Sequence, residues 1–248
     1  MVGLTIIGDE ILSGRRVDKH FSHAIDYFQE LGIDIGWAAY LGDDAASLAD
    51  HFRRVRESND VTFSFGGIGA TPDDVTRQAM AVAHDVTIIR HPQAAALIEK
   101  RFGDGAYPNR ILMADLPDGA RLIPNEFNKI PGFSLSNIHC LPGFPEMAWP
   151  MMDWVIRSHY ILPDKRGLTC YSFVVKNVRE SELITMLESV QQQFPAVKIS
   201  SLPRFPAEGL WQTELGVRGE KLLALQAVNL LKMRILENGY EVSQKENC

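Results

Sequence analysis

The stretch FSFGGIGATPDDVT, residues Phe63 to Thr76, places an apolar run directly before three glycines and then two adjacent carboxylates. Glycine lacks a Cβ, so backbone amides in such a turn can approach an anion closely. A phosphate held there would be repelled by Asp73 and Asp74 unless a positive charge lay between them. The stretch therefore predicts a buried strand followed by an anion-binding turn, and it leaves the two carboxylates to be explained.

The glycine pattern matches neither of two common nucleotide-binding motifs. A Walker A loop would end in Gly-Lys-Ser/Thr, and a dinucleotide fingerprint would read GxGxxG, whereas this turn reads GGxGxT. A divalent cation such as Mg²⁺ explains carboxylates beside a phosphate, because Mg²⁺ takes oxygen ligands from one or two carboxylates and from substrate phosphates. In this interpretation the acids hold the cation, and the amides of residues 66–71 hold the anion.

Apolar runs of strand length alternate with helical patterns along the first two thirds of the chain. This alternation predicts parallel strands joined by right-handed helical crossovers, and so a doubly wound α/β sheet. Thr71 is expected to cap a helix that begins near Pro72, and Asp18 to cap an earlier helix that stops at Gly32. The expected strands are residues 2–7, 33–41, 61–65 and 85–90, and the expected helices are residues 18–32, 46–58, 72 onward and 91–102.

An acidic pair follows each of the first three expected strands. Ligands of doubly wound sheets bind beyond the carboxyl ends of the strands, so the three pairs should share one edge of the sheet. Any single pair has an ordinary explanation, because acids complement the helix dipole in a first turn and are common in tight turns. Three pairs at one edge favour a common site. They are Asp9 with Glu10, Asp43 with Asp44, and Asp73 with Asp74.

Four motifs in this order resemble the MoaB/Mog molybdopterin-binding domain family. They are GDEILSGRRVDKH (residues 8–20), GDD (42–44), GGIGATPDDVT (66–76) and LPGFPEM (141–147). More narrowly, they are similar to the amino-terminal region of CinA proteins and to the molybdopterin-binding-like domain of FAD synthases. The resemblance covers about residues 1–162 and implies a three-layer α/β/α fold with a mostly parallel sheet. It also implies a pterin or adenine-nucleotide ligand beside the glycine turn.

The resemblance implies a role for each matching residue. Asp43 and Asp74 would be the catalytic carboxylates and would hold the metal, with Mg²⁺ expected and Mn²⁺ or Co²⁺ as alternatives. Ala70 stands where the CinA pattern commonly has proline, which removes no amide contact because proline has no N–H. The remaining ligand-binding residues would be Gly8, Asp9, Glu10, Ser13, Gly66, Gly67, Gly69, Thr71, Asp73, Pro142 and Gly143.

Other polar residues are weaker candidates. Asn125, Asn128 and Lys129 could reach a ligand, although turn chemistry explains the asparagines equally well. His20 and His23 lie three apart on an expected helix, which permits joint metal binding but provides no third ligand. The segment that holds the asparagines resembles the family's β-arm and last core strand, with short apolar runs at residues 111–114, 121–123 and 137–141.

After a linker at residues 161–167, the pattern changes to β-α-β-β-α over residues 168–248. This order is similar to the small α+β KH-like domain that follows the nucleotide domain in CinA proteins. The GXXG loop of RNA-binding KH modules is not evident, and the segment ESELITMLES gives the domain no basic face. RNA binding is therefore disfavoured, and packing or dimerisation is the expected use.

Composition limits the remaining possibilities. The net charge of −6 disfavours a nucleic-acid partner, and no apolar run approaches the ~20 residues needed to span a membrane. The three cysteines are far apart and indicate no disulfide framework, which favours a reducing cytoplasm. Relatives of the resembled family form dimers or trimers, so the resemblance implies a homo-oligomer.

Two functions remain open at this level. One is a divalent-metal-dependent nucleotide pyrophosphatase that releases AMP from FAD or ADP-ribose, which the CinA and FAD-synthase resemblance implies. The other is a non-catalytic molybdopterin- or nucleotide-binding protein linked to molybdenum cofactor biosynthesis. Complete acidic pairs favour catalysis, whereas a pure binding protein could use the glycine turn alone.

Overall fold

The structure is a computed structural model that describes residues 1–161, 168–204 and 211–244. The chain divides into two compact units, residues 1–162 and 163–248. Each unit has its own sheet and its own hydrophobic core. The units are therefore described separately.

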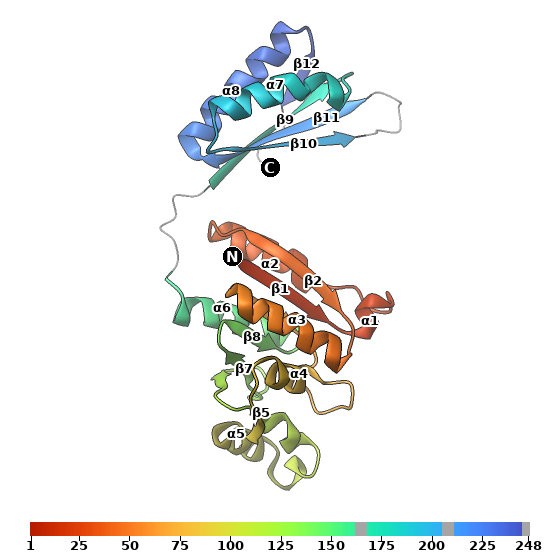
Figure 1. The fold of residues 1–248 in the computed structure, drawn as a ribbon, viewed down its shortest axis with the longest axis vertical. Coiled ribbons are helices and arrows are strands. Elements are labelled where there is room, and N and C mark those ends of the chain that lie inside the picture. The colour runs from red at the N-terminus through yellow and green to blue at the C-terminus, as the bar shows by residue number, and fades with distance from the viewer. Residues whose placement is uncertain (162–167, 205–210, 245–248) are drawn as a thin grey trace. The chain divides into compact units, whose positions relative to one another are not determined.

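The first unit is built on a six-stranded sheet in the order β2-β1-β3-β8-β7-β6 (Figure 1). The first four strands in this order run parallel, and β7 and β6 extend the sheet antiparallel. The expected mostly parallel sheet is thus confirmed. The strands are β1 (Val2–Ile7), β2 (Ile35–Leu41), β3 (Val61–Phe65), β6 (Arg121–Ile123), β7 (Gly132–Leu135) and β8 (Ile138–Leu141).

Helices cover both faces of this sheet and complete three layers. Side chains alternate between faces along a strand, and Phe63 and Phe65 of β3 enter the cluster formed with α2 and α6. The opposite face packs against α3 and α4, and α5 joins the same cluster. The helices are α1 (Asp9–Leu12), α2 (His20–Glu30), α3 (Ala45–Ser58), α4 (Thr76–Ala83), α5 (Pro92–Phe102) and α6 (Pro145–His159).

Two expectations for the middle of the chain are wrong. β4 (Ile88–Arg90) does not join the parallel sheet; it pairs antiparallel with β5 (Asp115–Pro117) in a separate two-stranded sheet. All three β4 side chains are exposed, which a central parallel strand does not allow. The apolar run 111–114 belongs to a 3₁₀ helix, η2 (Arg110–Ala114), that follows η1 (Gly103–Ala106).

The second unit contains a four-stranded antiparallel sheet in the order β10-β11-β9-β12. Its β-α-β-β-α order agrees with the sequence, which missed only the short β12 after the Gly239 turn. Apolar side chains of α7 and α8 pack on one face of the sheet. The likeness to KH domains stays a prediction. The elements are β9 (Leu168–Lys176), α7 (Glu180–Gln193), β10 (Lys198–Arg204), β11 (Gln212–Glu220), α8 (Lys221–Glu237) and β12 (Glu241–Gln244).

Two observations concern the expected location of the protein. Among the described residues, no helix has both the length and the apolar character needed to cross a bilayer. Cys140 is free and buried. A cytoplasmic location stays a prediction.

Candidate functional site

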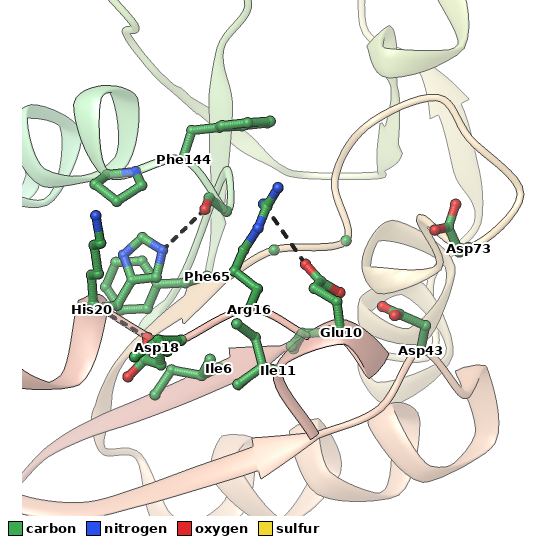
Figure 2. A pocket seen from close by; sticks show the side chains of 18 of the residues that line it. Ile6, Glu10, Ile11, Arg16, Asp18, His20, Asp43, Phe65, Asp73 and Phe144 are labelled. Atoms are coloured by element: carbon green, nitrogen blue, oxygen red, sulfur yellow. Dashed lines mark hydrogen bonds and ion pairs between the residues drawn. The ribbon is translucent and has the colours of Figure 1, made fainter. Parts of the chain in front are cut away.

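A cavity of about 400 Å³ lies beyond the carboxyl ends of β1, β2, β3 and β8 (Figure 2). This is the edge at which doubly wound sheets bind their ligands. The residues that line it and that the sequence predicted are Gly8, Glu10, Asp43, Gly66, Gly67, Asp73, Asp74 and Gly143. The predicted residues Asp9, Ser13, Gly69, Thr71 and Pro142 are outside the lining.

The glycine turn after β3 needs glycine for steric reasons. Gly66 has φ 106°, and a Cβ there would overlap the carbonyl oxygen of Ile7. Gly67 has φ 68°, and a Cβ would overlap the hydroxyl of Thr76. The Gly66 amide donates to the Leu141 carbonyl (2.9 Å), which ties the turn to β8. Of the expected amide donors, Gly66 is therefore already engaged.

The helix after this turn begins later than the sequence predicts. α4 starts at Thr76, so the expected start near Pro72 and the expected cap at Thr71 are wrong. The cause lies in the turn, because the Thr76 amide donates to the Gly67 carbonyl (3.0 Å) and the Thr76 hydroxyl donates to the Gly66 carbonyl (3.1 Å). These bonds hold the helix start against the glycines and leave residues 68–75 as a loop.

Asp74 folds back onto this loop. Its Oδ2 accepts hydrogen bonds from the Thr71 amide (2.9 Å) and from the Thr71 hydroxyl. The turn passes so close to this carboxylate that a Cβ at Gly69 would overlap Oδ2. Gly69 and Thr71 thus position Asp74, while the cavity itself is lined by Asp74.

Arg77 holds the loop in place through hydrogen bonds to backbone carbonyls. This residue of α4 is only 4% exposed, and its guanidinium donates to the Gly69 carbonyl (2.6 Å) and to the Leu112 carbonyl. Burial lowers the pKa of Arg77, and the nearby charges of Asp74 and Asp115 oppose that shift. Sequence reasoning missed Arg77 because its partners are backbone carbonyls, which no side-chain pattern marks, and one of them lies 35 residues away.

The acidic pairs after β1 and β2 interlock. The Asp9 amide donates to Asp43 Oδ2 (2.9 Å), and the Asp43 amide donates to Asp9 Oδ1 (3.2 Å). Asp44, by contrast, is the N-cap of α3 and accepts from the Ser47 amide (2.8 Å). The ordinary helix-start explanation is thus correct for Asp44, and Asp43 is the member of its pair that lines the cavity.

Carboxylates gather around Asp43. Burial raises the pKa of Asp43, and the charges of Asp9, Glu10 and Asp73 add to the shift, while the hydrogen bond from the Asp9 amide opposes it. Figure 2 shows Glu10, Asp43 and Asp73 on the same side of the cavity. Asp73, which the sequence alone favours as a helix-start acid, therefore contributes charge to the cavity. This concentration of negative charge would attract a cation.

The donor set suits a hard divalent cation better than a transition metal. In the part of the chain that the structure describes, no three His, Cys, Asp or Glu residues are positioned to hold one ion together. Mg²⁺ does not need such a cage, because it keeps water ligands and takes one or two carboxylates with substrate phosphates. Asp43 and Asp74 line one cavity and offer carboxylate oxygens, so these residues fit that group.

Sequence reasoning missed the opposite side of the cavity. His20 is buried, stacks on Phe65 with ring centroids 4.4 Å apart, and bonds through Nε2 to the Gly143 carbonyl (3.2 Å). Arg16 and Lys19 also line the cavity. Their signal was present in the RRVDKH segment, which follows GDEILSG in the family resemblance. Phe144 and Glu146 at the start of α6 were missed as well.

The two histidines of α2 do not form a metal pair. His23 stacks on Trp149 (3.8 Å between ring centroids), while His20 lies on Phe65.

Asp18 accepts hydrogen bonds from the amides of His20 (2.8 Å) and Phe21 (3.1 Å). It therefore caps the start of α2, as the sequence predicts, from one position before the N-cap residue Lys19.

Turn chemistry accounts for the remaining candidates. The side-chain oxygen of Asn125 accepts from the Phe127 amide (3.1 Å), and that of Asn128 accepts from the Ile130 amide (2.9 Å). Lys129 pairs with Glu126. None of these three candidates is among the residues that line the cavity.

The fold and this site define a class of protein. The model of the family described as "probable molybdopterin binding domain" matches residues 3–161, and the chain belongs to this family. The match coincides with the first unit and includes every residue that lines the cavity.

Within this family the chain is similar to CinA-like proteins. A CinA-like protein of Desulforapulum autotrophicum is 30% identical over 213 residues, which is 80% of this chain and 50% of that protein. A protein of Aeropyrum pernix is 26% identical over 98% of this chain and 96% of its own length. The crystal structure of a CinA protein of unknown function from Thermoplasma acidophilum covers 64% of this chain and 99% of its own, with 26% identity and a TM-score of 0.59. The chain spans between 35% and 50% of the length of the first CinA-like relatives.

Proposed function

We propose that the cavity binds a phosphorylated pterin or an adenine dinucleotide and that, with the help of a divalent cation, it hydrolyses the pyrophosphate of a nucleotide ligand such as FAD or ADP-ribose. The observation that carries the proposal is the sharing of one cavity by the glycine turn and the carboxylates of Glu10, Asp43, Asp73 and Asp74. The volume of about 400 Å³ lies within the usual range for small-molecule sites. FAD or ADP-ribose would yield AMP and the other phosphate product.

Each part of the cavity has a defined task in this proposal. Asp43 and Asp74 would hold the cation, which when bound polarises the bridging pyrophosphate. The amides of Gly67 to Gly69 would donate to the phosphate oxygens and stabilise the charge that develops as water attacks phosphorus. Arg16 and Lys19, which also line the cavity, would neutralise the rest of the ligand's charge. Gly69 and Thr71 would act by positioning Asp74.

A non-catalytic role in molybdenum cofactor biosynthesis is the second candidate. One observation favours it: Asp74 Oδ2 is already held by two hydrogen bonds from Thr71, so this carboxylate has less freedom to bind a cation. A protein of this kind would bind molybdopterin or a nucleotide without turnover.

A panel of ligands separates the two functions. FAD, ADP-ribose, NAD and adenylyl-molybdopterin are each incubated with Mg²⁺, Mn²⁺ or Co²⁺, and AMP release is measured by chromatography. AMP release from at least one ligand, abolished by EDTA, supports the pyrophosphatase. Saturable binding of one ligand in calorimetry without AMP release selects the binding protein.

A further inference from the structure

Phe144 is an unfavourable residue for its position, which is the start of a helix. It is the N-cap of α6, a helix of 15 residues, and no side chain caps that helix end. Ser, Thr, Asp or Asn at this position would satisfy a free amide and stabilise the helix. The ring gains little from burial, because 53% of the residue is exposed. Residues that break a local rule without a gain in stability are found at functional sites.

The ring lies at the wall of the cavity that the glycine turn also lines. Phe144 and Pro145 both line the cavity. The residue before them, Gly143, is a neighbour of the glycine turn, because a Cβ added to it would make an ordinary contact with Gly66 Cα at 3.6 Å. Figure 2 shows the Phe144 ring on the far side of Arg16 from the carboxyl groups of Asp43 and Asp73. The cavity thus has an acidic end and an aromatic end.

Arg16 stands between these two ends and is held only weakly. Its guanidinium carbon lies 6.0 Å from the centroid of the Phe144 ring, and its Nη1 lies 4.0 Å from Glu10 Oε1. The Arg16 and Glu10 side chains are 59% and 39% exposed, so solvent screens this ion pair. The Arg16 side chain can therefore move to contact a ligand without losing strong existing contacts.

We propose that Phe144 is a stacking subsite for the planar heterocycle of the ligand. The inference rests on the proposed function, because it assumes that the diphosphate of the same ligand occupies the glycine turn. A heterocycle on the half-exposed ring covers apolar surface and gains stacking contact, and it leaves Arg16 beside the diphosphate. The ligand class is therefore a diphosphate ester joined to an adenine, flavin or pterin ring, rather than a simple sugar phosphate or inorganic pyrophosphate.

The experiment compares a ligand that has a base with ligands that lack one. The fluorescent analogue 1,N⁶-etheno-ADP-ribose is titrated with Ca²⁺ in place of Mg²⁺ against the wild-type chain, Phe144→Leu, Phe144→Trp and Phe127→Leu, and AMP release is monitored so that binding of the intact probe is measured. Phe127 is the matched control, because it is 70% exposed in the same unit and does not line the cavity. Binding of inorganic pyrophosphate, ribose 5-phosphate, FAD and a free pterin is measured directly by calorimetry under the same conditions.

Loss of the ring in Phe144→Leu is expected to weaken binding of the etheno-ADP-ribose about 10-fold or more, the usual scale for base stacking on an aromatic side chain. Phe144→Trp should keep the affinity and quench the probe, and Phe127→Leu should change nothing. Pyrophosphate affinity should be equal in all four proteins, and melting temperatures should agree because the ring is half-exposed.

Two results overturn the inference and are distinguishable. If the wild-type chain binds the probe and Phe144→Leu binds it equally well, the stacking subsite is wrong and the proposed function stands. If the wild-type chain binds neither the probe nor FAD nor the free pterin in direct titrations, the stacking subsite and the proposed function are both wrong.

Discussion

At the scale of single residues, the site depends on glycines, which lack a Cβ, as much as on its carboxylates. Gly66 and Gly67 occupy backbone conformations in which a Cβ would strike Ile7 or Thr76. The carboxylates differ in their surroundings: Asp44 caps a helix, Asp74 is held by Thr71, and Asp43 lies among like charges. Aspartates that follow the strands in similar motifs therefore have different tasks. Two single-residue tests follow from this difference and from the glycine turn.

Asp74→Asn should lower metal-dependent AMP release by about 100-fold or more, the scale on which one group that stabilises transition-state charge acts. The amide side chain keeps an oxygen that can accept from Thr71, so the fold should survive and the melting temperature should stay within a few degrees. Release is measured by chromatography under saturating Mg²⁺.

Asp44→Asn is the control for this variant, because Asp44 caps α3 and asparagine is an equally good N-cap. Its turnover should equal that of the wild type. Full turnover in Asp74→Asn would show that Asp74 does not hold the cation. Asp73 would then be the next carboxylate near Asp43 to test.

Gly66→Ala should destabilise the protein more than Gly14→Ala does. Both glycines have positive φ, which costs about 1–2 kcal/mol for alanine. Only Gly66 adds a collision with backbone, which raises the cost by a further ~1–3 kcal/mol. A Cβ at Gly14 would meet nothing within 4 Å. Urea unfolding followed by circular dichroism measures both, and equal midpoints would contradict the steric account.

At the scale of elements, the loop between β3 and α4 is held by long-range contacts. The sequence places the helix start near Pro72, whereas bonds from Thr76 to the glycine turn move it to Thr76. Arg77, one residue further, joins this loop to η2 through the Leu112 carbonyl. β1 and α3 are likewise joined by the buried pair Thr5 and His51 (2.8 Å). Both joints allow a stability test.

Arg77→Met should lower the free energy of unfolding by at least about 2 kcal/mol, because it leaves buried carbonyls without their charged donor. The same change should weaken ligand binding, since the Gly69 carbonyl loses its anchor. Arg53→Met on the surface of α3 is the control, and it should cost less than about 1 kcal/mol because Arg53 pairs with Asp50 in solvent. A cost for Arg77→Met no larger than that of the control would show that the anchor does not stabilise the loop.

His51→Gln should make the protein less sensitive to acid. Burial lowers the pKa of His51 to about 4, and the Arg54 charge lowers it too, while the unfolded value is 6.5. The unfolded state therefore binds the proton first, and stability present above pH 6.5 is lost as pH falls toward 4. Glutamine can still bond to Thr5 and does not titrate. Melting temperatures between pH 7 and 4.5 should fall less in His51→Gln than in the wild type or in the control His159→Gln, whose side chain is exposed. An equal fall in all three proteins would exclude His51 as the cause.

At the scale of the whole molecule, the two units have separate cores. Phe173, Leu215 and Leu231 belong to the second unit's cluster, and the clusters of the first unit contain no residue beyond Tyr160. Every described residue that lines the cavity belongs to the first unit. The homo-oligomer that the resemblance implies stays a prediction, which sedimentation of the full chain can test.

A chain of residues 1–162 should fold and bind the ligand as the full chain does, because the described residues of its core clusters and of the cavity lining all lie in the first unit. Thermal melting and titration of etheno-ADP-ribose measure both properties. Loss of binding in a folded fragment would show that the second unit completes the site.

The sequence by itself determined the features that are local in the chain. Alternating apolar periods predicted the parallel sheet and the second unit's β-α-β-β-α order, and glycines and acids after strands predicted the sheet edge at which the cavity lies. These features could be predicted because periodicity and turn chemistry depend on near neighbours. Seven of the eight predicted residues that line the cavity lie in these loops, whereas Gly143 was implied by the family resemblance alone.

Only the tertiary structure decided which polar groups meet. His20 against Phe65, Asp9 against Asp43, and Arg77 against the Leu112 carbonyl all join distant parts of the chain. The position of β4 follows from its antiparallel pairing with β5, and the late start of α4 follows from the hydrogen bonds between Thr76 and the glycine turn. Such contacts leave no periodic trace, because their energy depends on geometry that exists only after the sheet has formed. Because of that geometry, the carboxylates, the glycine turn and the Phe144 ring line one cavity.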